Sequence, residues 1–518
     1  MFGLYAGVLC LMLGGIAVDV MHYEAVRTRI QNTADTATLA AANLDQTLDP
    51  KAVVDDYFAK AGMTQYLKSV TVTSTMNARQ VDVSASASVP TIFMQMDGIK
   101  TLTSSNQSTA MQSIGNVEIA LALDNSGSMN EQAGSGTPTT VCTTKHSKKY
   151  GTSYQSCHTT YVYTTKIQAL KDAANQFVDT IYGQANSDTV TMSIVPYDAH
   201  VNVGPDLMAY LNVAPSDYAS PTMCIDENGL DFSTTKIDAT QTFNRFPNFQ
   251  DGYYYPGPEV CDSSSNRNSI VFSSNPTALH TAINAMYANG NTSIDLATKW
   301  AAATLDPGFQ PVVSKMIAAG KLSSSYAGRP AAFGDHNFMK VLIVMTDGDN
   351  TLRENLAPAY QTGPSQVWYD SQGGYSYYDP SYNQYYSVSR GYWASKPYGS
   401  NPKQLSYPQL WGQMSVYSYA ANIVYPALGY AGFANAYNSA IIATDTPQEN
   451  ANLQSVCSAA KNQGVLVYTI GFQTDAPGAA QLQQCATNSS FYFDAQGTNI
   501  TSVFSKIAAS IQHLRLTQ

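Results

Sequence analysis

An alternation of apolar, strand-like runs with helical segments between residues 116 and 518 restricts the fold most strongly. Runs such as NVEIALAL, TVTMSIVPYD, FMKVLIVMTDGDN and VLVYTIGF alternate with helical stretches such as TKIQALKDAANQFVDTIYG and ENANLQSVCSAAKNQG. Alternating strands and helices are typical of an α/β fold, in which helices cover a doubly wound, mostly parallel sheet. We therefore predict this fold class for the larger part of the chain.

Polar side chains follow two of these predicted strands at the point where each strand ends. Asp124, Ser126 and Ser128 follow the run NVEIALAL, and Asp347 follows the run FMKVLIVMT. Thr292, within NGNTSI, stands just ahead of a predicted helix. One D-x-S-x-S is weak evidence alone, because turns favour Asp and Ser for backbone reasons. However, α/β sheets bind ligands outside the carboxyl ends of their strands, so these residues are candidates for a single site.

The motifs D-x-S-x-S, G-x-T and T-D-G, in this order, resemble the metal-ion-dependent adhesion site of von Willebrand factor A domains. The resemblance covers residues 116–518 and implies a Rossmann-type sheet with large insertions. It also implies one divalent cation, held by Asp124, Ser126, Ser128, Thr292 and Asp347. Such oxygen ligands suit Mg²⁺ or Mn²⁺, with Ca²⁺ as an alternative. Because only two of the five ligands carry charge, the ion stays electrophilic, and a partner's acidic side chain can supply the missing ligand.

The N-terminus begins with an unbroken apolar and glycine run at residues 2–18, at the short end for crossing a bilayer. A secretory signal peptide is the alternative. No basic region precedes the run, and helical pattern continues through HYEAVRTRIQNTADTATLAAANL. We therefore expect one helix that starts in the membrane and emerges from it. The missing basic flank leads us to expect that the true start lies upstream.

The segment AVDVMHYEAVRTRIQNTADTATLAAA resembles the N-terminal anchor of TadG-like proteins of the tight-adherence (Flp) pilus assembly system. This resemblance implies a single-pass protein of the bacterial inner membrane, with its main domain in the periplasm or exposed outside the cell. It also implies a pilus or envelope component as partner. The matching positions are Ala17, Val18, Asp19, Arg27, Arg29, Gln31, Ala34, Asp35 and Leu39 to Ala42.

The chain divides into three predicted parts. The membrane and juxtamembrane helix takes residues 1–48. A small β-rich subdomain takes residues 49–115, where SVTVTSTM and QVDVSASASV alternate at period two. The von Willebrand factor A-like domain takes the rest, with insertions at about 130–164, 204–274 and 352–447. The last insertion is rich in tyrosine, and we interpret it as either a partner-selecting surface or a self-packed decoration.

Cysteine usage indicates an oxidising compartment. One of the seven cysteines, Cys10, lies in the predicted span, and the other six form an even set. Fifteen pairings are formally possible, and reduced, buried cysteines are the alternative. A zinc site with His146 and His158 is a less simple interpretation of the first pair. Proximity suggests disulfides Cys142 with Cys157, Cys224 with Cys261, and Cys457 with Cys485.

Composition and motifs argue against two classes of function, nucleic-acid binding and catalysis. A net charge of -10 argues against nucleic-acid binding, which leaves a basic footprint. The sequence offers no G-x-S-x-G elbow, no H-E-x-x-H and no good general base, so we do not expect an enzyme. We expect a membrane-anchored, metal-dependent binding or adhesion protein of pilus assembly. The alternatives are a structural, minor pilin-like component whose metal only stabilises the fold, and a metal-dependent hydrolase.

Overall fold

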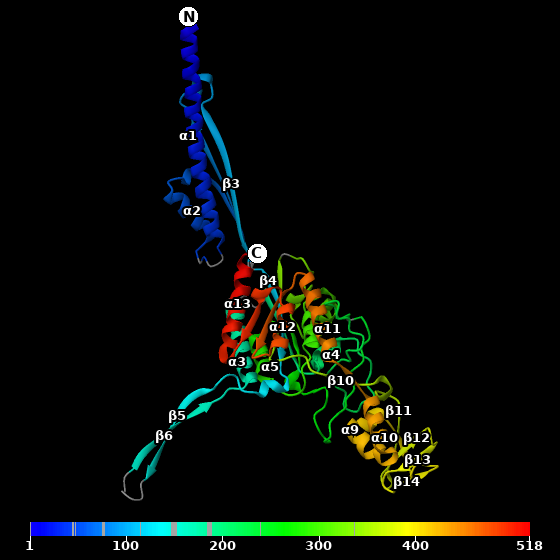
Figure 1. Cartoon of the computed structure of the whole chain (residues 1–518). Coiled ribbons are helices and arrows are strands. Elements are labelled where there is room, and N and C mark those ends of the chain that lie inside the picture. Colours follow the sequence, from blue (N-terminus) through cyan, green and yellow to red (C-terminus); the bar gives the residue numbers. More distant parts are fainter. Residues whose placement is uncertain are drawn as a thin grey trace. The chain divides into compact units, whose positions relative to one another are not determined.

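The computed structural model forms two compact units, residues 1–115 with 513–518 and residues 116–512, and each is described by itself (Figure 1). The described residues are 2–43, 46, 48–74, 78–113, 115–146, 153–183, 189–238, 240–335 and 337–517.

The first unit packs a long helix against a three-stranded antiparallel sheet. Valines at alternate positions of the middle strand are buried, and Val81 and Val83 share a core with Ala34 of the long helix and Phe58. Asp19 of the same helix accepts hydrogen bonds from the backbone N–H groups of residues 92–94 at 2.7–2.8 Å. The elements are α1 (Phe2–Ala42), α2 (Pro50–Lys60), β1 (Leu67–Ser74), β2 (Ala78–Pro90) and β3 (Thr101–Ser113), in sheet order β1-β2-β3.

Helix α1 continues without a break through the segment predicted to emerge from a membrane. Among the residues that the structure describes, no helix combines the length and the apolarity that crossing a bilayer requires. The predicted span of residues 2–18 falls partly outside the described set, because the side chains of residues 2–11 are not described.

The second unit is built on a mixed sheet of six strands among the described residues, in the order β18-β17-β9-β4-β7-β8. All neighbouring strands are parallel except β7 and β8, which are antiparallel. The α/β class with a parallel sheet is thus confirmed, with one antiparallel edge strand. The strands are β4 (Asn116–Asp124), β7 (Val190–Tyr197), β8 (Ile270–Ser273), β9 (Phe338–Thr346), β17 (Leu466–Phe472) and β18 (Tyr492–Ala495).

Helices cover both faces of this sheet. On one face, Ala122 of β4 shares a core with Ala297 and Val456 on two helices. On the other, the Tyr468 hydroxyl hydrogen-bonds Ser510 at 2.9 Å. Apolar side chains on both faces account for strands that are buried along nearly their whole length. The helices are α3 (Lys166–Gly183), α4 (Gly204–Tyr210), α5 (Pro276–Ala285), α6 (Ile294–Ala303), α7 (Gln310–Ala318), α11 (Thr446–Asn462), α12 (Ala476–Cys485) and α13 (Ile500–Thr517).

The Tyr-rich segment forms its own folded layer. The strands β10 (Arg353–Leu356) and β16 (Ile441–Thr444) form a two-stranded antiparallel ladder, and an antiparallel sheet in the order β14-β13-β12-β11-β15 lies between them in sequence. Val367 and Tyr377 pack inward on Trp411 and on Phe246 from the second insertion. The remaining elements are β11 (Pro364–Asp370), β12 (Gly374–Asp379), β13 (Gln384–Ser387), β14 (Tyr392–Ala394), β15 (Lys403–Ser406), α8 (Tyr407–Trp411), α9 (Val416–Tyr419), π-helix η9 (Ala420–Val424) and α10 (Tyr425–Ala440).

The first insertion is a β-hairpin of β5 (Thr137–His146) and β6 (Ser153–Val162), whose side chains are mostly exposed. The structure forms the three predicted disulfides. One clamps this hairpin, where Cys142 lies directly opposite Cys157. A disulfide there leaves no thiolate for zinc. The others join Cys224 to Cys261 within the second insertion, and Cys457 of α11 to Cys485 of α12.

Candidate metal centre

Two carboxylates meet at the carboxyl ends of neighbouring parallel strands. Asp124 is the last residue of β4, and Asp347 directly follows β9. The register pairs Leu123 with Met345, so the two strands end side by side. Asp124 and Asp347 are 0% and 5% exposed. The sequence therefore brings two like charges together in a buried place.

The two serines extend this pair into one hydrogen-bonded chain. The loop continues into the 3-10 turn η3 (Gly127–Asn130). Asp124 Oδ1 accepts a hydrogen bond from the Ser126 N–H at 2.7 Å. Ser126 Oγ and Ser128 Oγ lie 3.1 Å apart, and Ser128 Oγ donates to Asp347 Oδ1 at 2.6 Å. Four of the five predicted ligands are thus linked in the fold.

Thr292 lies on the loop that enters α6. Its N–H donates to Thr351 Oγ1 at 2.8 Å, and the Thr351 N–H donates back to the Thr292 carbonyl at 2.8 Å. Thr351 stands four residues after Asp347, so this pair ties the Thr292 loop to the second carboxylate loop. Among the described residues, no hydrogen bond joins the Thr292 hydroxyl to the other four candidates.

The Thr292 loop also contacts the first motif directly. The Gly127 N–H donates to the Gly290 carbonyl, and the Asn289 N–H donates to the Asn125 carbonyl, both at 2.9 Å. Gly290 has φ +86°, and a Cβ there would lie 2.6 Å from Asp198 Oδ2. A side chain at this position would therefore push the loop away from the site.

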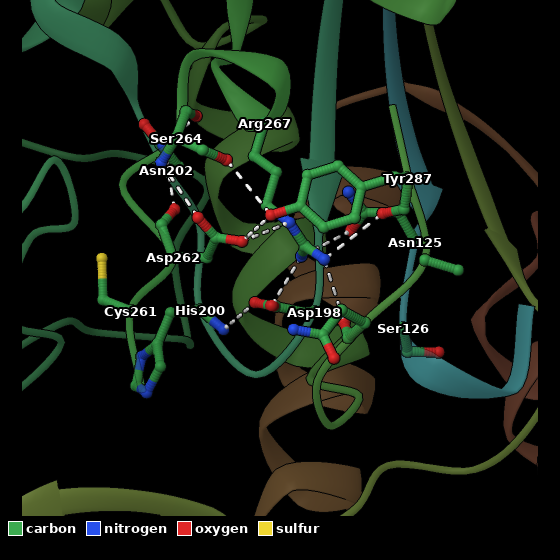
Figure 2. Close-up of polar contacts among 12 residues, drawn as sticks. Asn125, Ser126, Asp198, His200, Asn202, Cys261, Asp262, Ser264, Arg267 and Tyr287 are labelled. Atoms are coloured by element: carbon green, nitrogen blue, oxygen red, sulfur yellow. Dashed lines mark hydrogen bonds and ion pairs between the residues drawn. The ribbon is translucent and has the colours of Figure 1, made fainter. Parts of the chain in front are cut away.

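A buried arginine from the second insertion supports these loops (Figure 2). The Arg267 guanidinium contacts Asp198 Oδ2 at 2.6 Å and Asp262 Oδ2 at 3.1 Å. It also donates to the carbonyls of Tyr287 and Asn289 at 3.3 and 3.2 Å. The central guanidinium carbon, Cζ, lies 4.4 Å from the centre of the Tyr287 ring. Arg267 thus joins the end of β7 to the loop that carries Thr292.

The electrostatics of the carboxylate pair are uneven. Burial, together with the nearby charge of Asp347, raises the pKa of Asp124 above its usual range. Thr346 Oγ1 donates to Asp124 Oδ2 at 2.7 Å. Asp347 has a different partner, because Lys166 Nζ lies 3.0 Å from its Oδ2 and 2.8 Å from Glu131 Oε2.

Burial disfavours the charged form of Lys166, but the hydrogen bonds that its ammonium donates to Glu131 and Asp347 outweigh this effect and raise the pKa of Lys166. The ammonium therefore stays charged beside the candidate metal site.

The donor set fits a hard divalent cation. Two buried carboxylates and neutral hydroxyls converge, and like charges in a low-dielectric place are stabilised by a cation between them. Among the described residues, no group of three or more His, Cys, Asp or Glu could hold a metal ion. The candidate site does not depend on such a group, because hydroxyl oxygens complete it.

Sequence reasoning missed three residues of this site. Thr346 stood inside the T-D-G motif, so the motif could have indicated it. Lys166 and Arg267 belong to no motif, and the aspartates that tie them to the site, Asp347 and Asp198, lie 181 and 69 residues away in sequence.

The comparisons with known proteins agree with the N-terminal resemblance. Residues 1–44 match the family described as putative Flp pilus-assembly TadE/G-like. The predicted relation of this segment to pilus-assembly proteins is therefore confirmed. Among curated proteins, no sequence matches the chain.

Several solved structures resemble the chain weakly. Pilus adhesin SpaC from Lactobacillus rhamnosus GG, in its open conformation, has 12% identity and a TM-score of 0.31. That match covers 86% of this chain and 33% of SpaC, so the chain spans about a third of the adhesin. The vWF domain of the type V pili tip protein Mfa5 from Porphyromonas gingivalis has 13% identity and a TM-score of 0.32, over 78% of this chain and 97% of that one.

A third similar structure is proximal thread matrix protein 1 from the mussel byssus, with a zinc-occupied MIDAS motif. It has 11% identity and a TM-score of 0.26, over 77% of this chain and 46% of that protein. Because these scores are low, the assignment of the site rests on this chain's own residues.

Proposed function

We propose that this chain is a membrane-anchored, metal-dependent binding protein that takes part in assembling or anchoring a tight-adherence pilus. Its main unit would be a doubly wound domain of the von Willebrand factor A type. The observation that supports this most is the hydrogen-bonded convergence of Asp124, Ser126, Ser128 and Asp347 at two neighbouring strand ends. One divalent cation, Mg²⁺ or Mn²⁺ with Ca²⁺ as the alternative, is the proposed ligand.

The proposed mechanism follows from which atoms are fixed. Asp124 is held by the Ser126 N–H and by Thr346, and Asp347 is oriented by Ser128 and Lys166. When bound, the ion supplies an electrophilic position that accepts a carboxylate oxygen. Three of the five ligands are neutral hydroxyls, so the protein leaves that position attractive to an acidic side chain of a pilus or envelope partner.

The proposed location rests on the N-terminal segment. Residues 1–44 match a pilus-assembly family, and residues 2–18 are apolar or glycine throughout. We place residues 2–18 in the inner membrane and the rest of the chain in the periplasm or outside the cell. The disulfides of the structure suit an oxidising compartment of this kind.

The deciding experiment is Asp124→Ala in the full-length chain, expressed in cells and scored for pilus formation. Loss of pili with normal protein level and an intact thermal transition supports metal-dependent binding. Normal pili, together with loss of metal stabilisation, would instead identify the structural alternative. Asp172→Ala, an exposed aspartate on α3, is the matched control.

The Tyr-rich sheet is the proposed selector of the partner. Trp368 packs edge-on against Tyr378 and Tyr385, with ring centroids 5.0–5.9 Å apart, on the face opposite Val367 and Tyr377. Trp368→Ala with Tyr385→Ala should reduce pilus formation and leave metal-dependent stabilisation unchanged. Normal pili in this variant would make the sheet a self-packed decoration.

A further inference from the structure

Lys166 is held at the site by contacts at both ends of the residue. Its N–H donates to the Glu131 carbonyl at 2.8 Å, at the base of the first insertion. Its side chain is 7% exposed and places the ammonium between Glu131 Oε2 and Asp347 Oδ2. The position is therefore built by the fold and does not depend on a mobile surface side chain.

The two oxygens of Asp347 have separate roles. Oδ1 accepts from Ser128 and faces the candidate ligands, whereas Oδ2 accepts from Lys166. An occupied Oδ2 leaves Asp347 only one oxygen for a metal ion. Ca²⁺ often takes carboxylates through both oxygens, whereas Mg²⁺ prefers single oxygens in an octahedron. Lys166 therefore favours the smaller ion.

The ammonium also changes the charge balance. With both carboxyl groups ionised, Asp124, Asp347 and Lys166 leave one negative charge in the buried part of the site, while Glu131, whose side chain is 67% exposed, lies at its solvent edge. A divalent ion converts this into one surplus positive charge. Without Lys166, the same ion would neutralise the two carboxylates completely.

We propose that Lys166 makes the divalent ion and an acidic ligand bind cooperatively. The ammonium weakens binding of the ion alone by repulsion, and the surplus positive charge strengthens binding of a carboxylate to the loaded site. By thermodynamic linkage, a bound carboxylate raises the affinity of the site for the ion by the same factor. This inference rests on the proposed metal-dependent function, and it identifies when the site closes on its partner: only when ion and acidic group are both present.

The test measures Mn²⁺ affinity of the full-length chain by calorimetry, with and without saturating acetate. Lys166→Gln should raise the Mn²⁺ affinity measured without acetate about tenfold. It should also reduce, by a similar factor, the gain in Mn²⁺ affinity that acetate causes. Lys166→Arg keeps the charge and should stay within about threefold of the native chain. Lys171→Gln, on the same helix, removes the same charge away from the site and should change neither quantity.

Three results would overturn the inference. One is Lys166→Gln binding Mn²⁺ no more tightly than the native chain. Another is an acetate effect that survives in this variant. The third is an equal change of Mn²⁺ affinity and acetate effect in Lys171→Gln, which would show that the effect comes from the overall charge of the protein and not from Lys166. Asp124→Ala separates this failure from that of the proposed function: if Mn²⁺ binding is absent from the native chain and from Lys166→Gln, or persists in Asp124→Ala, the metal site itself is wrong.

Discussion

The two ends of strands β4 and β9 carry buried charges of opposite design. Near the start of the strands, Glu118 lies directly opposite Lys340, and the two form a salt bridge. At the carboxyl ends, Asp124 and Asp347 bring two negative charges together. The same pair of strands therefore ends in a closed ion pair on one side and in like charges on the other.

We call the end with Glu118 and Lys340 the closed end, and the end with Asp124 and Asp347 the open end. At the closed end, both charged groups are fully engaged in contacts within the fold. Glu118 also accepts a hydrogen bond from the Ala331 N–H at 3.0 Å, and Lys340 donates to the Leu305 carbonyl at 2.9 Å. Burial lowers the pKa of Lys340, against the attraction of Glu118. Burial and Asp347 raise the pKa of Asp124 at the other end. Buried like charges are costly to the fold, which makes that end the better place for a ligand.

The largest expected effect breaks the closed end. Lys340→Met leaves Glu118 buried without its partner and should lower the free energy of unfolding by about 3–5 kcal/mol. Urea unfolding of the full-length chain measures it. The double variant Glu118→Gln with Lys340→Met removes both charges and should recover much of the loss. A single variant within about 1 kcal/mol of the native chain would contradict the contrast between the ends.

The next effect tests the open end. Asp124→Asn removes one of the like charges, so the metal-free protein should lose little stability. Excess Mg²⁺ at about a hundred times its dissociation constant should stabilise the native chain by about 2.7 kcal/mol relative to EDTA, and this gain should vanish in the variant. Thermal midpoints with EDTA and with Mg²⁺ measure it. An unchanged midpoint of the native chain with excess Mg²⁺ would contradict the metal assignment.

The open end was predictable from the sequence, and the closed end was not. Asp124, Ser126 and Ser128 form a local motif behind an apolar strand, so residue type and spacing place them at one strand end. Glu118 and Lys340 are 222 residues apart, and neither belongs to a motif. Their pairing depends on strand register, which a single sequence does not reveal.

The same limit applies to the Tyr-rich segment and to the sheet edge. Alternating aromatics such as Trp368 and Tyr378 indicated contact surface, but not that one face would pack on Phe246 of another insertion. The antiparallel pairing of β8 followed from how the second insertion returns to β7, which no local pattern records. The strand-helix alternation, by contrast, predicted the α/β class.

Glu449, a buried carboxyl group outside both strand ends, offers a third case in which burial and charge can be compared. Glu449 of α11 is fully buried, and no side chain among the described residues hydrogen-bonds to its carboxyl oxygens. Arg353 Nη1 lies 3.8 Å from Glu449 Oε1, but the same guanidinium also forms closer ion pairs with Asp295 and Glu227. Burial raises the pKa of Glu449 to about 9, against the attraction of Arg353. The folded state therefore keeps a proton that the unfolded state releases.

This raised pKa predicts a pH dependence with a definite sign. The stabilisation by the retained proton is complete below the ordinary pKa of 4.5 and is lost as pH rises towards about 9. Glu449→Gln should remove this decline and stabilise the protein by about 1–2 kcal/mol at pH 8. Urea midpoints of both proteins between pH 5 and pH 9 measure it. Parallel profiles would show that Glu449 does not hold the proton.

The smallest expected effect separates hydrogen bonding from charge at the open end. Ser128→Ala removes a neutral hydroxyl that donates to Asp347 Oδ1 and changes no charge. Because Lys166 still satisfies the other oxygen, the metal-free protein should lose only about 1 kcal/mol. Loss of one neutral ligand should weaken Mn²⁺ binding about tenfold, measured by calorimetry beside the exposed Ser135→Ala control. An unchanged Mn²⁺ affinity would mean that the carboxylates alone hold the ion, and the hydroxyls of the motif would then serve only to shape the loop.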